Sequence, residues 1–393
     1  MSSQLSYSPY DYRIHEDPYP VYERLLEEAP IYRNEELGFW ALSRHADVAG
    51  AFRDWEAYSS INGVALDPSS WGPQAHRVMS ILALDPPRHT RLRALVSKGF
   101  TPRRVRELHP RILELTKRYL EPAVEEGSFD FVAEFAGKLP MDVISELMGV
   151  PESDRAELRR LGDMVVHREE GLNDVPPAGM EAALTLIGYY VDLVAEKRRK
   201  PADDLTTALT EAQIDGDRLE DKEIIAFLFL MVVAGNETTT KLLANSLYWA
   251  WKHGLTRDAL HNPVDGWIEE TLRYDPSSQQ IARTVAQDAV YHGQKVEAGD
   301  RLLLLIGAAN RDPRVFTDPS VYDLSRDTSQ IISFGAGRHY CLGANMARLE
   351  AQIALAELSS RISDYEIDES AAVRVHSSNV RGFARLPLIT TPR

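Results

Sequence analysis

The chain contains a single cysteine, and the residues around it restrict what this side chain can do. Cys341 lies in the segment FGAGRHYCLG, which spans residues 334–343. Two earlier glycines in this run permit an irregular turn, and Gly343 lets a flat group approach the backbone. A helix is predicted over residues 344–358. A thiol at a helix start lies near free N–H groups and the positive end of the dipole, which both favour the thiolate.

A lone cysteine is most often only a small buried apolar side chain, but this setting indicates a metal ligand. Without a second cysteine, a thiolate cannot build an iron–sulfur cluster, a CxxC redox pair or a c-type heme link. Ligation of heme iron by one thiolate remains, and we predict it for Cys341.

The segment 334–343 closely resembles the heme-binding loop of the cytochrome P450 family, and the resemblance covers essentially the full length. It implies a mainly α fold with a minor β part: a large helical domain around the heme plus a small β-rich part. Residues 1–393 are expected to form a single domain. It also implies heme b (iron protoporphyrin IX) as the cofactor, Cys341 as the metal ligand, and Phe334 and Gly343 as residues against the cofactor.

Composition excludes several classes of protein. A formal net charge of −15 argues against nucleic-acid binding, which needs a dominant basic face. One cysteine allows no internal disulfide, as in a reducing cytoplasm. Residues 1–17 contain no signal-peptide core, and the longest apolar run, residues 224–234, is too short to span a bilayer. We therefore expect a cytoplasmic protein without a membrane anchor, and a monomer.

Hydrophobic periodicity predicts mostly helices, with a few short strands. The segment 310–327, rich in Asp, Pro and Arg, is expected to be an ordered loop. The expected helices span 18–28, 102–124, 151–167, 180–200, 221–252, 263–274 and 344–362, and the expected strands span 38–43, 285–292 and 301–305, with more near the C-terminus.

Polar residues interrupt the predicted buried helix 221–252 at Ala234-Gly235-Asn236-Glu237-Thr238-Thr239. Glycine in a helix interior costs about 1 kcal/mol relative to alanine. Glu237 could simply pair with Lys241 at i,i+4 on a solvated face. The segment instead looks like the oxygen-activation motif of the family. By that resemblance Thr238 hydrogen-bonds dioxygen and an ordered water, Glu237 relays protons from solvent, and Ala234 and Gly235 leave room for dioxygen over the heme.

Heme carries two carboxylates that need charged partners when buried. In the run DPPRHTRLR, the prolines favour a helix start, and His89 and Arg93 share a face at i,i+4. An ordinary surface helix would show the same pattern. The run is similar to the propionate-binding helix of the family, and Arg283 and His339 match the remaining propionate ligands.

Glu270 and Arg273, at i,i+3, project from one side of a helix. An exposed pair of this kind contributes little to stability. In the family, Glu-x-x-Arg forms a buried ion pair with a later arginine, here expected to be Arg326, and supports the cysteine loop.

No flavin or nicotinamide fingerprint is present, because Tyr340 occupies the third glycine position of a GxGxxG motif that would begin at Gly335. Electrons are therefore expected from another protein, and the family resemblance implies a ferredoxin and an NAD(P)H-dependent ferredoxin reductase. A basic segment without Asp or Glu is the expected docking site, although half of its cations could be solvated or hold heme. Its cations are Arg88, Arg91, Arg93, Lys98, Arg103, Arg104 and Arg106.

The resemblance implies a heme-thiolate monooxygenase that inserts one oxygen atom from dioxygen into a hydrophobic small molecule, of terpenoid, steroid, polyketide or fatty-acid type. The alternatives are a peroxygenase, isomerase or dehydratase of the same fold, against which Glu237 and Thr238 argue, and a non-catalytic heme or ligand-binding protein. The expected substrate-lining parts are 60–83, 165–180, Leu230, Val233, Ala234, 277–282 and 379–383.

Overall fold

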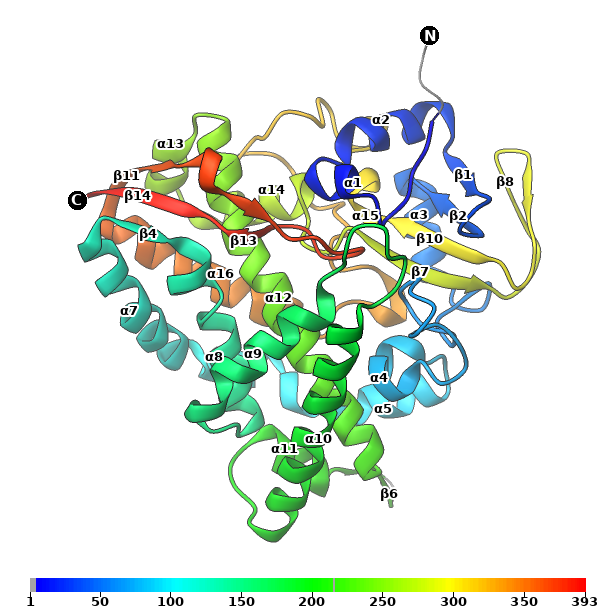
Figure 1. Cartoon of the computed structure of the whole chain (residues 1–393), viewed down its shortest axis with the longest axis horizontal. Coiled ribbons are helices and arrows are strands. Elements are labelled where there is room, and N and C mark those ends of the chain that lie inside the picture. Colours follow the sequence, from blue (N-terminus) through cyan, green and yellow to red (C-terminus); the bar gives the residue numbers. More distant parts are fainter. Residues whose placement is uncertain (1–4, 215) are drawn as a thin grey trace.

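The computed structural model describes residues 5–214 and 216–393. Helices dominate it, and a smaller strand-rich part lies beside the N-terminal helices (Figure 1). The helices are α1 (Tyr12–Glu16), α2 (Tyr19–Glu28), α3 (His45–Arg53), α4 (His76–Met79), α5 (Arg88–Val96), α6 (Pro102–Glu107), α7 (His109–Glu126), α8 (Leu139–Met148), α9 (Glu152–Val166), α10 (Pro177–Arg199), α11 (Leu205–Glu211), α12 (Asp221–Lys252), α13 (Thr256–His261), α14 (Val264–Tyr274), α15 (Ile306–Ala309) and α16 (Ala344–Arg361).

The strands form one larger sheet and several small ones. The five-stranded sheet has the order β1-β2-β10-β7-β3, and a three-stranded sheet has the order β11-β14-β4. The strands are β1 (Ile31–Asn34), β2 (Phe39–Leu42), β3 (Tyr58–Ser59), β4 (Ser128–Asp130), β5 (Gln213–Ile214), β6 (Asp217–Arg218), β7 (Gln280–Val285), β8 (Ala289–Tyr291), β9 (Gln294–Val296), β10 (Arg301–Leu305), β11 (Ile362–Ile367), β12 (Val373–Arg374), β13 (Phe383–Arg385) and β14 (Pro387–Pro392).

Helix α12 runs through the middle of the molecule (Figure 1). Its 32 residues give a length of about 48 Å. A capping box starts it, because the Glu220 side chain accepts from the backbone of Glu223 and the Glu223 side chain accepts from that of Glu220. It packs against α8, α9, α10, α14 and α16, so the polar motif in its centre lies inside the helical part.

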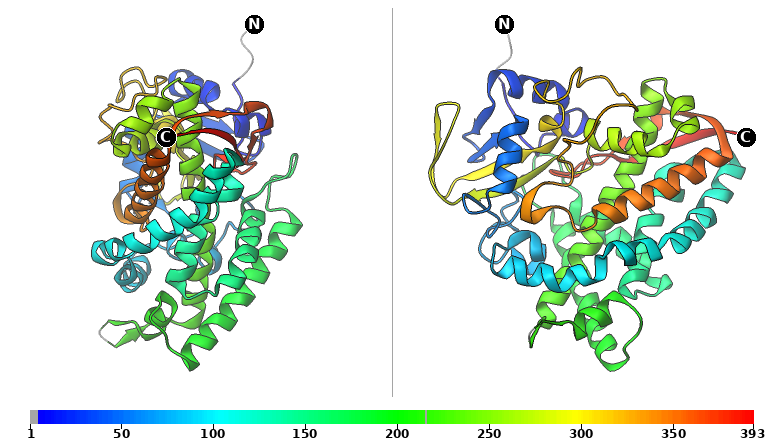
Figure 2. Two further views of the ribbon diagram at one scale, coloured as in Figure 1. Left: turned by 90° about the vertical axis from the view of Figure 1, so that its left-hand side faces the viewer. Right: turned by 180° about the vertical axis from the view of Figure 1, so that it is seen from behind.

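Helix α16, which follows the cysteine segment, packs against α7. It lies on the face turned away from the viewer in Figure 1, which the right-hand view of Figure 2 shows from the front. Most expected elements are confirmed, and helix 221–252 and strand 301–305 have the predicted bounds. The expected helix 102–124 is split into α6 and α7, with Pro110 in the first turn of α7. The expected strand 285–292 is wrong, since the ladder of β7 ends at Val285 and a separate hairpin strand, β8, follows.

Two helices, α10 and α12, are long and apolar enough to cross a membrane when judged by length and composition alone. More than half of the apolar stretch of α12 is buried inside the protein, as in the core helix of a globular protein, and one third of that of α10 is buried.

Candidate active site

The Cys341 segment forms a tight turn. The backbone N–H of Cys341 donates to the carbonyl oxygen of Phe334 at 2.9 Å. Gly335 and Gly337 have φ angles of +70° and +68°, which confirms the predicted irregular turn. A Cβ on Gly337 would lie 2.9 Å from the carbonyl oxygen of Phe52. The turn therefore needs glycine at this position for close approach as well as for its backbone angles.

The surroundings of the Cys341 thiol agree only in part with the prediction that the helix start favours the thiolate. Burial raises the pKa of Cys341, while the N–H groups of Gly343 and Ala344 and the cation of Arg93 act to lower it. The predicted influence of the helix start is present, but burial outweighs it. A bound metal cation deprotonates a coordinating thiol, so ligation itself would supply the thiolate.

Four basic side chains predicted to bind carboxylates come together near this segment. The rings of His89 and His339 have centroids 4.2 Å apart. Arg93 Nη2 donates to the carbonyl oxygen of Tyr340 at 2.6 Å. Arg283 is buried, and its Nη1 donates at 2.8 Å to a backbone carbonyl of its own strand. The positive charge of Arg283 also acts on His339.

Within the described residues, none of these four basic side chains forms an ion pair, and Asp85 acts on His89 and Arg283 only as a nearby charge. Both ring nitrogens of the buried His89 have no hydrogen-bond partner among the described residues. Burial, reinforced by neighbouring cations, lowers the pKa of His89 to about 4 and that of His339 to about 2. Burial lowers the pKa of Arg283 to about 10, against the attraction of Asp85. Buried donors without partners are costly, so the cluster fits a buried anion.

Heme b meets this requirement, because its two carboxylates provide charged acceptors for such a cluster. A Cβ on Gly343 would meet nothing within 4 Å, so the packing of the protein itself does not require glycine there. Cys341 keeps an accessible surface, although the atoms packed around its thiol desolvate it and raise its pKa. The residues present therefore fit a flat, iron-containing group with two carboxylates.

The motif in α12 leaves part of the helix uncovered. Ala234 is exposed and Thr238, one turn later, is half-buried. The Thr238 hydroxyl donates to the carbonyl oxygen of Ala234 at 2.7 Å, which competes with the regular helix ladder. A Cβ on Gly235 would meet only Ile144, at an ordinary 3.8 Å. The small residues thus form a notch that the packing of neighbouring side chains does not require.

Glu237, the neighbour of Thr238 in the motif, lies in a buried charge network. It is 2% exposed, and its Oε2 lies 3.1 Å from Lys241 Nζ. The i,i+4 ion pair considered from the sequence is therefore present, but it is buried rather than solvated. Asp163 of α9, which packs against α12, acts on the pKa of Glu237 as well. Although burial acts to raise the pKa of Glu237, Lys241 and Asp163 outweigh it and lower that pKa.

The predicted structural ion pair is confirmed. Arg273 Nη2 lies 2.7 Å from Glu270 Oε1, and both side chains are fully buried. Arg326 Nε lies 3.3 Å from the same oxygen, and the N–H of Asp323 donates to it at 2.9 Å. The network joins α14 to the long loop that precedes the Cys341 segment.

In the structure, only some cations of the basic segment are free of carboxylate partners within the described residues. Arg91 forms ion pairs with Asp217 and Glu223, and Arg103 forms one with Glu107 at 2.9 Å. The side chain of Lys98 lies outside the described residues. Arg88, Arg104 and Arg106 are exposed, and no ion pair is found for them within the described part of the chain. The last two belong to α6, which packs against α16.

The loops expected around the substrate are joined to one another. Arg168 Nε forms a buried ion pair with Asp67 at 2.8 Å, and the Ser69 hydroxyl donates to Asp174 at 2.6 Å. These contacts tie the segment 165–180 to the segment 60–83. The segments 277–282 and 379–383 pair through a β-bridge between Ser278 and Val380.

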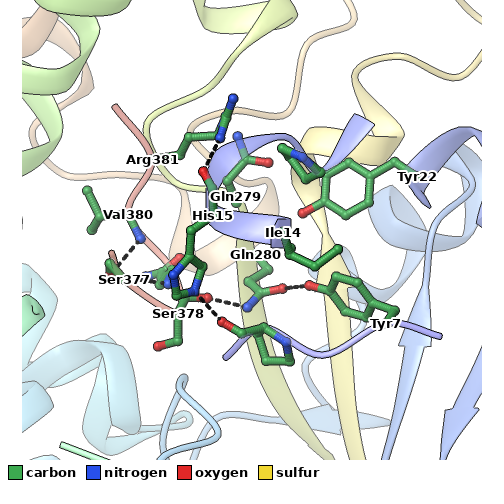
Figure 3. Close-up of a pocket in the computed structure, with 13 residues that line it drawn as sticks. Tyr7, Ile14, His15, Tyr22, Gln279, Gln280, Ser377, Ser378, Val380 and Arg381 are labelled. Carbon is green, nitrogen blue, oxygen red and sulfur yellow. Dashed lines mark hydrogen bonds between the residues drawn. The ribbon is translucent and has the colours of Figure 1, made fainter. Parts of the chain in front are cut away.

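A small pocket lies where the segments 277–282 and 377–381 meet the N-terminal residues (Figure 3). His15 Nε2 donates to the carbonyl oxygen of Pro9 at 2.8 Å, and the Tyr7 hydroxyl donates to Gln280. Burial lowers the pKa of His15 to about 4, so this ring is neutral near pH 7. None of the residues predicted to hold heme or relay protons lines this pocket in the described structure. We therefore do not identify it with the active site.

Comparison with known proteins agrees with this geometry. Residues 263–369 match the model of the cytochrome P450 family. Cytochrome P450 123 of Mycobacterium tuberculosis is 59% identical over 394 residues, which cover 99% of this chain and 98% of that protein. The chain belongs to the cytochrome P450 family. It is accordingly a cytochrome P450 monooxygenase with heme b as its cofactor.

Two further relatives have names or structures that mention steroids. The vitamin D(3) 25-hydroxylase of Pseudonocardia autotrophica is 36% identical over 394 residues, covering 96% of this chain and 95% of that protein. The crystal structure of CYP109E1 from Bacillus megaterium in complex with testosterone matches with a TM-score of 0.83 at 31% identity, covering 95% of this chain and 99% of that one. These matches confirm the predicted fold class.

Sequence reasoning did not find Asp163 or Asp85 as part of this region. Asp163 lies near the end of α9 between Gly162 and Met164, and Asp85 accepts from the backbone of Ser60 at 2.9 Å. Both act through contacts between elements far apart in the chain, which no local pattern signals.

Proposed function

We propose that this protein inserts one oxygen atom from dioxygen into a hydrophobic small organic molecule, by hydroxylation or epoxidation, with electrons from a ferredoxin and an NAD(P)H-dependent ferredoxin reductase. The observation that carries the proposal is the basic cluster, with His89 and Arg283 buried, beside a cysteine that keeps an accessible surface. Cys341 would bind the iron, and His89, Arg93, Arg283 and His339 would hold the carboxylates, with Phe334 and Gly343 against the ring. When bound, heme supplies the activation of dioxygen.

The motif residues of α12 would deliver protons and leave room for dioxygen. Thr238 can exchange its 2.7 Å hydrogen bond to Ala234 for one to dioxygen or to an ordered water. Glu237, charged and held by Lys241, can accept a proton and pass it toward Thr238. Because Ala234 and Gly235 have small side chains or none, they leave the notch open, and a small molecule such as dioxygen fits beside the helix.

We further propose a steroid-like substrate class as the first to test. One relative is named for vitamin D3 and another was crystallised with testosterone. The test is a titration of the heme-loaded protein with testosterone, vitamin D3 and, as comparison, a long-chain fatty acid. A saturable shift of the heme spectrum with testosterone or vitamin D3, but not with the fatty acid, supports this class. A shift with the fatty acid alone contradicts it.

Turnover then separates the candidate activities. Product that requires both dioxygen and a ferredoxin with its reductase supports monooxygenation. Product formed with hydrogen peroxide alone at an equal rate would instead indicate a peroxygenase, and binding without any product would indicate a carrier. We also expect a cytoplasmic monomer, which size-exclusion chromatography with light scattering of the soluble fraction tests.

A further inference from the structure

Arg348 of α16 contacts side chains near both ends of the turn that carries Cys341. Its guanidinium carbon lies 4.5 Å from the centroid of the Phe334 ring, within the range of a cation–π interaction. Its Nη1 lies 3.4 Å from the Tyr340 hydroxyl oxygen. Phe334 accepts the backbone hydrogen bond of Cys341 at 2.9 Å, and Tyr340 directly precedes the cysteine in the chain. One side chain therefore holds the turn near its start and next to the cysteine.

Arg348 is itself held by Glu269 of α14. Its Nε and Nη2 donate to the two carboxylate oxygens of Glu269 at 2.5 and 3.0 Å, a bidentate geometry that the planar guanidinium provides and an ammonium does not. Both side chains are 26% exposed, so solvent and salt screen the pair only in part. Because α14 and α16 also pack against each other, the position of Arg348 is fixed. We call Glu269, Arg348, Phe334 and Tyr340 the Arg348 clamp.

The Arg348 clamp also brings charge to the cysteine. Although burial raises the pKa of the Cys341 thiol, the cations of Arg93 and Arg348 both act to lower it. Arg93 belongs to the cluster that the proposed function assigns to the heme carboxylates. Arg348 instead has a carboxylate of its own in Glu269. It is therefore a cation acting on the thiol for which the proposed function gives no role.

We propose that Arg348 is a positioning residue for the iron ligand: held by Glu269, it fixes the turn of Cys341 and sets the charge beside the thiolate, and it thereby sets how readily the bound heme iron accepts an electron. This inference deepens the proposed function and rests on the assignment of Cys341 as the ligand. One electron enters from an external reductant, and no residue of the clamp takes up or releases a proton. A nearby positive charge stabilises the reduced site, and a nearby negative charge destabilises it.

The test compares the reduction potentials of heme-loaded wild type, Arg348→Gln, Glu269→Gln and the double variant. Spectroelectrochemistry with small mediators measures them, so that docking of a protein donor plays no part. Arg348→Gln leaves Glu269 without its cation, and the potential should fall. Glu269→Gln leaves Arg348 without its carboxylate, and the potential should rise. At a fixed applied potential the ratio of reduced to oxidised protein should change several-fold in opposite directions, and the double variant should lie between the two single variants.

Arg361 and Glu357 provide the matched control. They form an ion pair at the far end of the same helix, about 20 Å from Arg348 by the helix rise, with similar exposed fractions of 20% and 21%. Arg361→Gln and Glu357→Gln make the same changes in net charge and should leave the potential at the wild-type value.

Arg348→Lys separates charge from position. It keeps the cation but loses the planar fork that binds Glu269 with two bonds and stacks on Phe334. The potential should therefore lie nearer to that of wild type than the potential of Arg348→Gln does. The carbon monoxide complex of the reduced protein should nevertheless lose part of its thiolate band, because the turn that carries the ligand is held less firmly.

The possible failures are distinguishable. If Arg348→Gln does not take up heme, the rise in Glu269→Gln decides alone. Shifts in the same direction in both single variants would show that the pair only supports the fold, and wild-type potentials in both would remove its role. Either result overturns the inference, while a red-shifted carbon monoxide band in the same proteins keeps Cys341 as the ligand. A wild type without that band contradicts the assignment of Cys341 itself, and the inference falls with it.

Discussion

At the scale of single residues, Cys341 has no substitute within the chain, since it is the only cysteine. We predict that the reduced carbon monoxide complex of the wild type shows the red-shifted band of thiolate ligation. Cys341→His should move this band to the position of histidine-ligated heme and abolish monooxygenation, because imidazole donates less electron density than thiolate. Absorption spectra of the two proteins test this, and an unchanged band in Cys341→His would show that another ligand binds the iron.

Thr238 is expected to affect coupling rather than folding. Its hydroxyl is bonded only to the Ala234 carbonyl within its own helix, and such a bond adds little to helix stability. Thr238→Ala should therefore fold and bind substrate normally while diverting electrons to peroxide. Product and peroxide are measured per electron pair, with Thr240→Ser, which can keep its bond to Ala136, as the control. Unchanged coupling in Thr238→Ala would mean that another group delivers protons.

At the scale of elements, the Glu270 network joins α14 to the loop before the cysteine. Glu270→Gln would leave the guanidinium groups of Arg273 and Arg326 without their carboxylate. Breaking a buried ion pair in this way costs about 3–5 kcal/mol. The free energy of unfolding, measured by urea denaturation, should therefore fall by that amount. Glu269→Gln is the matched control, because its ion pair with Arg348 is partly exposed and should cost about 1 kcal/mol or less. Equal losses in both variants would contradict a special role for the buried network.

The same scale shows what the sequence could predict. The start of helix α12 was predictable because the apolar run 224–234 begins directly after the acidic residues of its capping box. Helix 102–124 was predicted as one because its apolar period continues across the junction at Leu108, where α6 ends and α7, with Pro110 in its first turn, begins. The effect of Asp163 on Glu237 was not predictable, since it depends on how α9 packs against α12. Local pattern thus predicts elements and motif residues, while pairing between elements comes only from packing.

At the scale of the whole molecule, the acidic charge is unevenly distributed. A net charge of −15 repels other acidic proteins at long range. Around α6, however, Arg104 and Arg106 are exposed and no carboxylate pairs with them in the described structure. The neighbouring helix α16 begins three residues after Cys341. We predict that the electron donor binds here, because the family resemblance places this basic segment on the face nearest the thiolate.

Charge reversal on α6 tests this docking surface. Arg104→Glu with Arg106→Glu should slow association with an acidic ferredoxin, because steering by opposite charges raises the association rate. The loss should shrink in about 1 M salt, where the Debye length falls to about 3 Å, and substrate-induced spectral shifts should not change. Arg199→Glu with Lys200→Glu, exposed cations at the end of α10, provide a control with the same change in net charge. If both double variants slow ferredoxin-driven reduction equally, total charge and not this surface governs the encounter.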